Sequence, residues 1–571
     1  MSYQIPHQDM MFLLKEVFSL KQKFEDIEDF AEFDEDLYSA ILEEAGKFAA
    51  GVLQPINQSG DEEACQFDNG LVTTPQGFKE AYQAFVQGGW QSLTASPNYG
   101  GQGLPKALHV LVEESFYSTN TSFCLYGSLT AGAYHLLQAH ADEELKQTYL
   151  PKMISGEWSG SMCLTEAHAG SDLGLLKTKA QPQADGSYKI SGSKIFITGG
   201  EHDMAENIIH LVLARLPDAP AGPKGISLFL VPKFKLDSDG ALGNRNGVMC
   251  GSIEHKMGIK ASSTCVMNFD DAEGYLIGGE HQGLSCMFTM MNLERLSIGI
   301  QGIGLGEMAY QQANAYAHDR LQGRVKDLDG TAPIIKHGDV QRMLNQMQAF
   351  NQAGRALGVW LGSYLDIAHH SQDPVKVAEA NEMAALLTPI AKAFFTDMGY
   401  EVCTIGQQCF GGHGYVKEWG MEQHVRDARI AQIYEGTNGI QALDLIGRKL
   451  VANQGSYVNS LLEIIGKDLD SFDKSEQKTL VEDKLVEFAA LSKLIIEKAD
   501  ADTQQLIACD YLHYSALVIY GYLWLKMSQP LILSGQESSF AESKTNLATF
   551  FFKRLLPKTL GLKASIENEL G

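Results

Sequence analysis

The feature that most constrains the fold of this chain is a change from helical to strand-like residue periodicity, followed by a return to helical periodicity. From Phe18 to Glu157, apolar residues recur at steps of three and four, which is typical of amphipathic helices. From Ser159 to Ile277 the chain changes to short β-branched and aromatic runs, such as "YKISGSKIFITGG" and "NIIHLVLARL", separated by turn segments such as "ADGS". Helical periodicity returns at Leu284. The pattern predicts an α+β fold in which one mostly antiparallel sheet or barrel lies between two helical regions.

The chain is long enough for several cores, because it has 571 residues of which 44% are hydrophobic. After Leu450 the segment "LVANQGSY" has the composition of a linker, and helical periodicity resumes beyond it. These breaks predict the following parts: an N-terminal extension (1–35), an N-terminal helical domain (36–158), a middle β domain (159–280), a helical bundle domain (281–450) and an additional C-terminal helical domain (458–571).

Charge and cysteine usage exclude some function classes. The chain carries 70 acidic and 45 basic residues, a net charge of −25, which disfavours binding to nucleic acid or to anionic membranes. The nine cysteines are scattered without a C-x-x-C pair, and the N-terminus lacks the pattern of an export signal. The apolar stretch from Tyr511 to Leu525 is too short for a transmembrane segment and is expected to be a buried helix. Together these features predict a cytoplasmic protein.

Three familiar motifs are rejected on their context. In "GIQGIGLGEMA" the form G-x-G-x-x-A is present, but Gly299, Gly302 and Gly306 follow one helical face, which favours close helix packing over a phosphate loop. Ser191 and Lys194 match S-x-x-K but lie in an expected strand rather than at a helix start. The histidines form no H-E-x-x-H pattern, so no metal site is expected.

Glu435 is the most informative single residue. In "IYEGTNGIQ" it is the only charged side chain between Arg429 and Asp444. A buried acid without a partner is costly, which suggests a chemical task. The alternative is an acid near a helix start, favoured by the helix dipole by about 0.3–1 kcal/mol.

Three stretches could bind a flat or anionic ligand. "MCLTEAHAGSD" places hydroxyl groups, small residues and a glycine where the strands begin. "QQCFGGHGY" is a glycine-rich loop between helical segments, and "EGTNG" places Thr437 and Asn438 at an expected helix N-terminus. Each stretch alone is also compatible with an ordinary turn.

Taken together, these stretches resemble the acyl-CoA dehydrogenase family. "MCLTEAHAGSD", "KIFITGG", "HKMGIKASSTCVMNF", "QCFGGHGY" and "RDARIAQIYEGTNGIQ" occur in that family's order and spacing between Pro97 and about Leu450. The resemblance implies a helical domain, a β domain and a second helical domain that enclose FAD. The N-terminal extension and the C-terminal helices are similar to the longer branch that includes 3-(methylthio)propanoyl-CoA dehydrogenases.

The resemblance also implies roles for individual residues. Glu435 would be the base that removes the α-proton of an acyl-CoA thioester while the flavin N5 accepts the β-hydride, and we interpret its isolation as the absence of competing charge near that base. The expected FAD contacts are Met162, Thr165, Gly170, Ser171, Phe196, Thr198, Arg320, Gln408, Gly411, Gly412 and Thr437. The expected substrate contacts are Ser171, Asn292, Arg295, Tyr434 and Gly436.

The expected function is FAD-dependent conversion of an acyl-CoA to the trans-2-enoyl-CoA by a homodimer, with an electron-transfer flavoprotein as acceptor. One alternative is an acyl-CoA oxidase, which shares the fold, flavin and base. Another is a non-catalytic flavoprotein of this fold that binds DNA or a partner, and the net charge and the presence of Glu435 argue against it. Acyl-chain length and branching are left open.

Overall fold

The computed structural model describes residues 2–326 and 328–571, without the side chain of Leu531. The chain forms two compact units. The helical unit comprises Met1–Ala50, Pro105–Thr119 and Arg295–Gly571, and the sheet unit comprises Gly51–Leu104 and Asn120–Glu294. The architecture is the expected α+β fold, in which helical regions precede and follow one block of strands.

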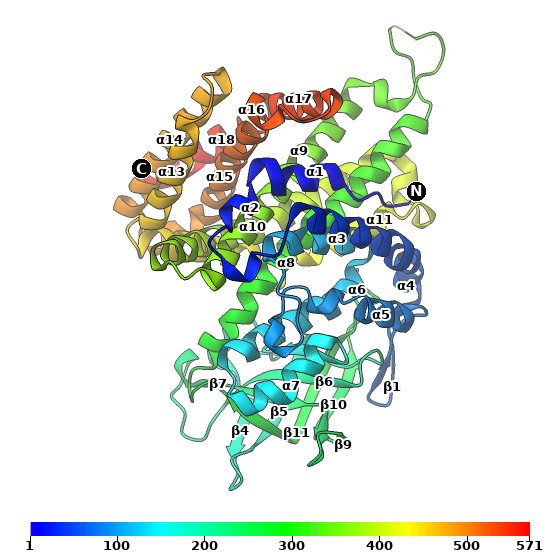
Figure 1. Ribbon diagram of the computed structural model, residues 1–571, viewed down its shortest axis with the longest axis vertical. Helices are drawn as coiled ribbons and strands as arrows, with labels where there is room; N and C mark the ends of the chain where they lie inside the picture. The colour runs from blue at the N-terminus through cyan, green and yellow to red at the C-terminus, as the bar shows by residue number, and fades with distance from the viewer. Residues whose placement is uncertain (1, 327) are drawn as a thin grey trace. The chain divides into compact units, whose positions relative to one another are not determined.

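The helical unit is built from long helices. Figure 1 shows them from the blue N-terminal helices to the red C-terminal ones. The main elements are α1 (His7–Phe12), α3 (Glu35–Phe48), α8 (Gly283–Asp319, which enters this unit at Arg295), α9 (Gly338–His370), α10 (Pro374–Cys409), α11 (Met421–Ala431), α12 (Asn438–Leu443), α13 (Ser456–Asp470), α14 (Glu476–Lys498), α15 (Ala501–Met527), α17 (Ser538–Arg554) and α18 (Lys558–Leu570).

The glycine stripe of α8 has the packing role expected from the sequence. A Cβ at Gly302 would lie 2.5 Å from the carbonyl oxygen of Phe395 on α10, and one at Gly299 would lie 3.1 Å from the Phe395 ring. The missing side chains let the two helix backbones approach closely. The stripe therefore belongs to a helix interface, and the rejection of a dinucleotide loop is confirmed.

Helix α15 forms the centre of the C-terminal helices. Between Tyr511 and Leu525 every side chain except His513 is buried, so the prediction of a buried helix in this stretch is confirmed. The helix packs against α9, α10, α12, α14, α17 and α18. Among the described residues no helix is both long and apolar enough to cross a membrane.

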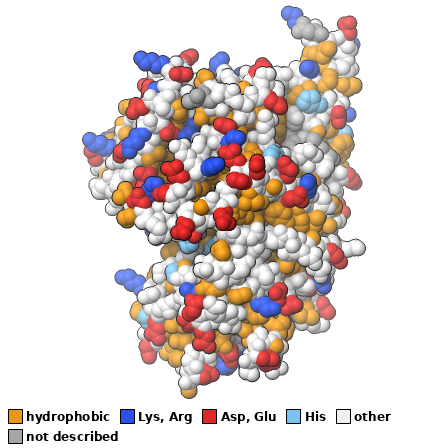
Figure 2. Space-filling view, viewed as in Figure 1, with side chains coloured by type: hydrophobic (Ala, Val, Ile, Leu, Met, Phe, Trp, Pro, Cys, Tyr) orange, Lys and Arg blue, Asp and Glu red, His pale blue; other side chains and the backbone are white. Residues whose placement is uncertain are grey.

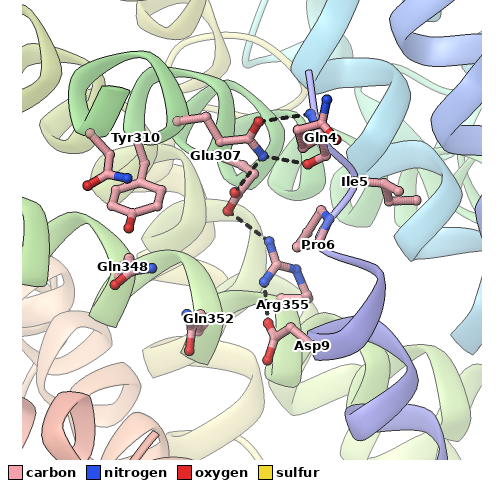
Figure 3. A pocket seen from close by; sticks show the side chains of 11 residues that line it. Gln4, Ile5, Pro6, Asp9, Glu307, Tyr310, Gln348, Gln352 and Arg355 are labelled. Carbon is pink, nitrogen blue, oxygen red and sulfur yellow. Dashed lines mark hydrogen bonds and ion pairs between the residues drawn. The ribbon is translucent and has the colours of Figure 1, made fainter. Parts of the chain in front are cut away.

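A buried charge cluster joins the first helix of the chain to helices near its end. Arg355 on α9 forms ion pairs with Asp9 of α1, Glu114 and Glu307, and Lys544 of α17 forms an ion pair with Asp9. Figure 3 shows Arg355 between Asp9 and Glu307 at the wall of a pocket of about 310 Å³. Removing one member of such a cluster leaves buried charge without its partner, so the cluster fixes the N-terminal segment on the bundle.

The sheet unit contains all the strands that the structure describes, together with several helices and the first residues of α8. Its helices are α4 (Asn57–Glu63), α5 (Phe78–Gln87), the part of α6 (Lys106–His140) after the non-helical residue Asn120, and α7 (Glu143–Ser155). Its large sheet contains β3 (Trp158–Cys163), β4 (Lys179–Pro182), β5 (Tyr188–Thr198), β6 (Asn207–Arg215), β7 (Ile226–Pro232), β10 (Val248–Ile253) and β11 (Thr264–Ile277).

Five strands of this sheet close into a small barrel. The pairs β6–β7, β7–β11, β11–β5 and β5–β4 are antiparallel, and a parallel contact between Lys179 of β4 and Arg215 of β6 completes the ring. The outer strands are β3, which is parallel to β6, and β10, which is antiparallel to β11. The expected mostly antiparallel barrel is thus observed, and its closure removes the free edges of the five ring strands.

Both faces of β6 and β7 are buried because the barrel has a core on each side. Val212 and Phe229 belong to an inner cluster of strand residues, whereas Leu211 and Leu228 belong to a second cluster with residues of α6 and α7. Figure 1 shows α7 lying over the strands. This explains why β6 is an apolar run rather than an alternating one.

The strong negative charge is distributed over the surface. Figure 2 shows acidic side chains scattered among basic and apolar ones on the face in view. Lys15 with Glu35 and Lys376 with Asp26 are examples of exposed ion pairs. Such pairs contribute little to stability, and the net charge of −25 acts mainly through solubility.

Candidate active site

Glu435 lies on a sharp turn between α11 and α12. Glu435 and Gly436 have φ angles of +55° and +77°, in the left-handed region that a glutamate rarely adopts. The Gln441 side-chain amide donates to both of their carbonyl oxygens, at 3.3 and 3.2 Å. A Cβ at residue 436 would lie 2.6 Å from Gln441 Nε2. Glycine is therefore required here, and a strained glutamate held in this way is typical of a functional position.

Burial raises the pKa of the Glu435 carboxyl above its ordinary value, while Lys392 and Arg295 act in the opposite direction. The expectation that this acid has no competing charge nearby is therefore wrong. The sequence separates Glu435 from other charges along the chain, but α10 and α8 bring two cations to it. Because the burial effect is the larger one, the carboxyl is still tuned towards a stronger base than an exposed glutamate.

Lys392 is the site residue that the sequence motifs missed. Its Nζ donates to the carbonyl oxygen of Gly436 and to Asn438 Oδ1, both at 2.9 Å. Burial lowers the pKa of Lys392 to about 8, against the attraction of Glu435. The sequence held a usable signal, because Lys392 is the only charged residue between Glu382 and Asp397.

Tyr434, Thr437 and Arg295, expected at the substrate or cofactor, lie in this same unit. The Tyr434 hydroxyl donates to Gln301 Oε1 at 2.5 Å, which fixes the ring beside the turn. Thr437 is the N-cap residue of α12, as expected for a helix start. Arg295 is buried on α8 and is electrostatically coupled to Glu435 and Asp444.

The residues expected to bind the FAD diphosphate and adenosine form a second, exposed group in the helical unit. Arg320 follows the end of α8, and the segment from Gln408 to Gly412 begins in the last residues of α10 and continues into a short 3-10 helix (Gly411–Tyr415). The rings of Tyr316 and Phe410 stack with centroids 4.2 Å apart, and the Tyr316 hydroxyl lies 3.0 Å from His413 Nδ1. These contacts hold the two segments side by side. Arg320, Gln408, Gly411 and Gly412 are all exposed.

In the sheet unit, a buried ion pair joins the first two motifs. Lys194 Nζ lies 2.9 Å from Glu166 Oε1 and donates to the carbonyl oxygen of Leu164. The backbone N–H of Ile195 donates to the carbonyl oxygen of Thr165 at 2.9 Å. "MCLTEAHAGSD" and "KIFITGG" are therefore adjacent segments of one surface, and Lys194, which was set aside with the S-x-x-K match, has a structural role between them.

Phe196 lies at a bulge. The register of β5 against β11 shifts between the pairs Ile197–Cys265 and Lys194–Met267, so an additional residue stands in β5. Phe196 has a φ of +60°, and 59% of its surface is exposed. Bulges of this kind re-aim a side chain out of the ladder. A large apolar ring exposed at such a position indicates a surface that another group covers.

The other expected residues of the sheet unit lie at or near the surface. Met162, Thr165 and Thr198 are partly buried, whereas Gly170, Ser171 and Asn292 are exposed. A Cβ at Gly170 would meet no atom within 4 Å, so its backbone is open to a ligand. Asn292 lies in the part of α8 that belongs to this unit.

Comparison with known families accounts for almost the whole chain. Residues 35–157, 161–272 and 281–451 match the models of the N-terminal, middle and C-terminal domains of acyl-CoA dehydrogenases, and residues 461–570 match a model described as acetyl-CoA dehydrogenase C-terminal like. The chain belongs to the acyl-CoA dehydrogenase family. It is an FAD-dependent oxidoreductase that dehydrogenates acyl-CoA thioesters, as the resemblance of the motifs implied.

Individual relatives support this assignment over most of their length. The chain is 46% identical to a 3-methylmercaptopropionyl-CoA dehydrogenase of Ruegeria pomeroyi, over 81% of this chain and 79% of that protein. It is 35% identical to a butyryl-CoA dehydrogenase of Syntrophomonas wolfei, over 93% and 91%. The structure of ACDH-11 of Caenorhabditis elegans in complex with C11-CoA shares the fold, with a TM-score of 0.79, 18% identity and coverage of 97% and 92%.

The residues of this acyl-CoA dehydrogenase fit the flavin that the family requires. The exposed Phe196 ring offers an apolar face, and the open backbone at Gly170 and the Ser171 hydroxyl offer polar contacts beside the motif that Lys194 and Glu166 join. A flat ring system with a polar edge needs this combination of apolar surface and few, well-placed polar groups. In the helical unit, the exposed Arg320 carries a guanidinium group, whose chemistry would suit a diphosphate contact.

Proposed function

We propose that this enzyme oxidises short, linear acyl-CoA thioesters at the α,β-bond with Glu435 as the catalytic base. The observation that carries the assignment of the base is the left-handed, doubly anchored turn that presents one carboxyl with a raised pKa. The substrate class is supported by the names of the two relatives, a 3-methylmercaptopropionyl-CoA and a butyryl-CoA dehydrogenase.

The residues of the chain supply binding, position and proton transfer. Bound FAD supplies the hydride acceptor for the β-carbon. Glu435 receives the α-proton, and partial removal from water makes its carboxylate a stronger base. Gln441 and Lys392 hold the carbonyl oxygens that follow the base, which limits the freedom of the turn. Lys392 and Arg295 limit the increase of the Glu435 pKa that burial causes, which favours the ionised carboxylate.

We further propose that the enzyme acts as a homodimer and passes electrons to an electron-transfer flavoprotein. Gln408, Gly411 and Gly412 are exposed, and they are followed by Tyr415, 85% exposed, and Trp419, 43% exposed. Exposed aromatic residues of this kind mark interaction surfaces. A second subunit that covers this segment would bring it to the partner's FAD, as the family resemblance implies. A cytoplasmic location stays a prediction.

The test is anaerobic reduction of the bound flavin by a panel of butyryl-CoA, 3-methylmercaptopropionyl-CoA, octanoyl-CoA and palmitoyl-CoA. The wild-type flavin band is expected to bleach with the two short thioesters most rapidly. Glu435→Gln, which keeps the size of the side chain and removes the base, is expected to retain FAD and to lose reduction by at least about 10³-fold.

Two outcomes would overturn parts of the proposal. Equal reduction in the Glu435→Gln variant and the wild type would remove Glu435 from the role of base. Rapid formation of hydrogen peroxide in air, at the rate of thioester oxidation, would favour the acyl-CoA oxidase alternative over transfer to an electron-transfer flavoprotein.

A further inference from the structure

One polar side chain of the C-terminal helices, His513, contacts the residues of α10 that hold the turn at Glu435. His513 is the only residue between Tyr511 and Leu525 that is not buried, and its side chain is 30% exposed. Its Nε2 lies 2.8 Å from Asp397 Oδ2 on α10. The ring meets Phe394 edge to face, with centroids 5.3 Å apart, which fixes its orientation.

Asp397 connects His513 to the residues on either side of Glu435, the proposed base. Its Oδ1 accepts hydrogen bonds from Asn438 Nδ2 at 2.7 Å and from Gln432 Nε2 at 2.6 Å. Asn438 Oδ1 in turn accepts from Lys392 Nζ at 2.9 Å, and Lys392 donates to the carbonyl oxygen of Gly436 at 2.9 Å. Burial works against the charge on Asp397, but the hydrogen bonds from His513, Gln432 and Asn438 outweigh it and lower the pKa of Asp397.

These hydrogen bonds form a continuous series from His513 to the carbonyl oxygen of Gly436. His513 acts on Asp397, Asp397 on Asn438, and Asn438 on Lys392, whose other acceptor is the carbonyl next to Glu435. Each link uses a charged donor or acceptor, and such hydrogen bonds are stronger and more directional than neutral ones. Loss of the hydrogen bond from His513 leaves Asp397 Oδ2 without this donor and makes the orientation of Asp397, Asn438 and Lys392 less restricted.

We propose that His513 is a positioning residue for the base, so that the C-terminal helical segment sets the geometry of the Glu435 turn through Asp397, Asn438 and Lys392. This inference rests on Glu435 being the base. It gives the additional C-terminal helices a part in the reaction. Those helices are thereby more than a cover for the bundle.

The test compares His513→Phe with His513→Gln in the full-length holoenzyme. Phenylalanine keeps a ring against Phe394 but cannot donate to Asp397, whereas the glutamine amide can replace the Nε2 donor. His513→Phe is expected to slow flavin reduction at saturating thioester by about tenfold, with an unchanged dissociation constant for the enoyl-CoA product. His513→Gln is expected to recover most of that loss. Gln505→Ala, an exposed change on the same helix, is the matched control.

A second measurement does not depend on turnover. Amide hydrogen exchange of residues 432–441 is expected to be faster in His513→Phe than in the wild type, His513→Gln or Gln505→Ala. If the wild-type flavin is reduced by no thioester, the proposed function fails, and the exchange comparison alone decides the role of His513.

Equal reduction rates in His513→Phe and an active wild type would overturn the inference, and so would a His513→Gln variant as slow as His513→Phe. Exchange of 432–441 that is identical in all four proteins would also contradict it. Should His513→Phe fail to fold, Asp397→Asn takes its place, and the same loss of rate and the same faster exchange are expected.

Discussion

Lys392 places a positive charge near the Glu435 carboxyl and lowers a pKa that burial raises. Lys392→Met removes that charge and keeps the length of the side chain. In the wild type, flavin reduction should increase with pH as Glu435 ionises, with a midpoint above its ordinary value of about 4.5. In Lys392→Met the midpoint is expected to lie at higher pH. Stopped-flow reduction between pH 5 and 9 measures it.

Lys493→Met is the control for this prediction, because Lys493 lies on α14 and its side chain is 77% exposed. Its midpoint should equal that of the wild type. A Lys392→Met midpoint at the wild-type pH, or below it, would show that Lys392 does not tune the base.

At the residue scale, the sequence pointed to Glu435, the proposed base, but not to its surroundings. Glu435 could be found because it stands alone in an uncharged segment and follows a recognisable motif. Lys392 stands equally alone, yet a lysine in an apolar helix has no such motif around it. Its proximity to Glu435 depends on how α10 packs against α12, and helix packing is not encoded in local periodicity.

Among the structural elements, the ion pair of Glu166 and Lys194 stabilises the junction of β3 and β5. Both side chains are almost fully buried. Lys194→Met leaves the Glu166 carboxylate without its cation and is expected to lower the free energy of unfolding by about 3–5 kcal/mol. The double variant with Glu166→Gln should recover part of this loss, because it removes the buried charge as well. Urea denaturation followed by circular dichroism measures both.

The pH dependence of the same pair has a defined sign. Burial opposes ionisation of Glu166, but Lys194 and Thr178 outweigh it and lower the pKa of the carboxyl to about 2. The pair therefore stabilises the fold fully above about pH 4.5 and loses this effect as the pH falls towards 2. Lys179→Met, an exposed change on β4, should leave both stability and its pH dependence unchanged. A Lys194→Met variant as stable as Lys179→Met would contradict the prediction.

The strands themselves were predictable, whereas the barrel was only one of two options. β-Branched and aromatic runs bounded by turn residues mark β5 and β6, and the ranges Tyr188–Thr198 and Asn207–Arg215 agree with the expected runs. The ring is completed by one pairing between β4 and β6, and β5 carries a bulge at Phe196 against β11. Register shifts of one residue leave no clear signal in a single sequence, because they depend on which partner strand is present.

At the scale of the whole chain, the buried cluster around Arg355 links segments that are remote in sequence. Asp9 comes from the first helix, Lys544 from α17, and Glu114 and Glu307 from α6 and α8. From the sequence, the first 35 residues are predicted only as an extension, because contacts over such separations cannot be derived from a local pattern. The cluster predicts that this extension is needed for stability.

Arg355→Met and Asp9→Asn are expected to lower the free energy of unfolding by different amounts. Arg355→Met leaves three carboxylates with Lys544 alone, whereas Asp9→Asn leaves two carboxylates with two cations. We expect Arg355→Met to lower the free energy of unfolding by about 3–5 kcal/mol and Asp9→Asn to cost clearly less. Urea titrations of the two variants and the wild type at pH 7 measure the difference. Equal costs would indicate that packing, rather than charge, dominates the cluster.

The effect of pH separates these explanations further. Burial raises the pKa of Glu114 to about 7 although Arg355 acts against it. A raised carboxyl pKa means that the folded state binds the proton more tightly, so this group reduces stability as the pH increases from about 4.5 through 7. Without Arg355 the reduction should be larger, and Arg355→Met should therefore lose more stability at pH 8 than at pH 5. A loss that is independent of pH would mean that the carboxylates of the cluster are not what Arg355 stabilises.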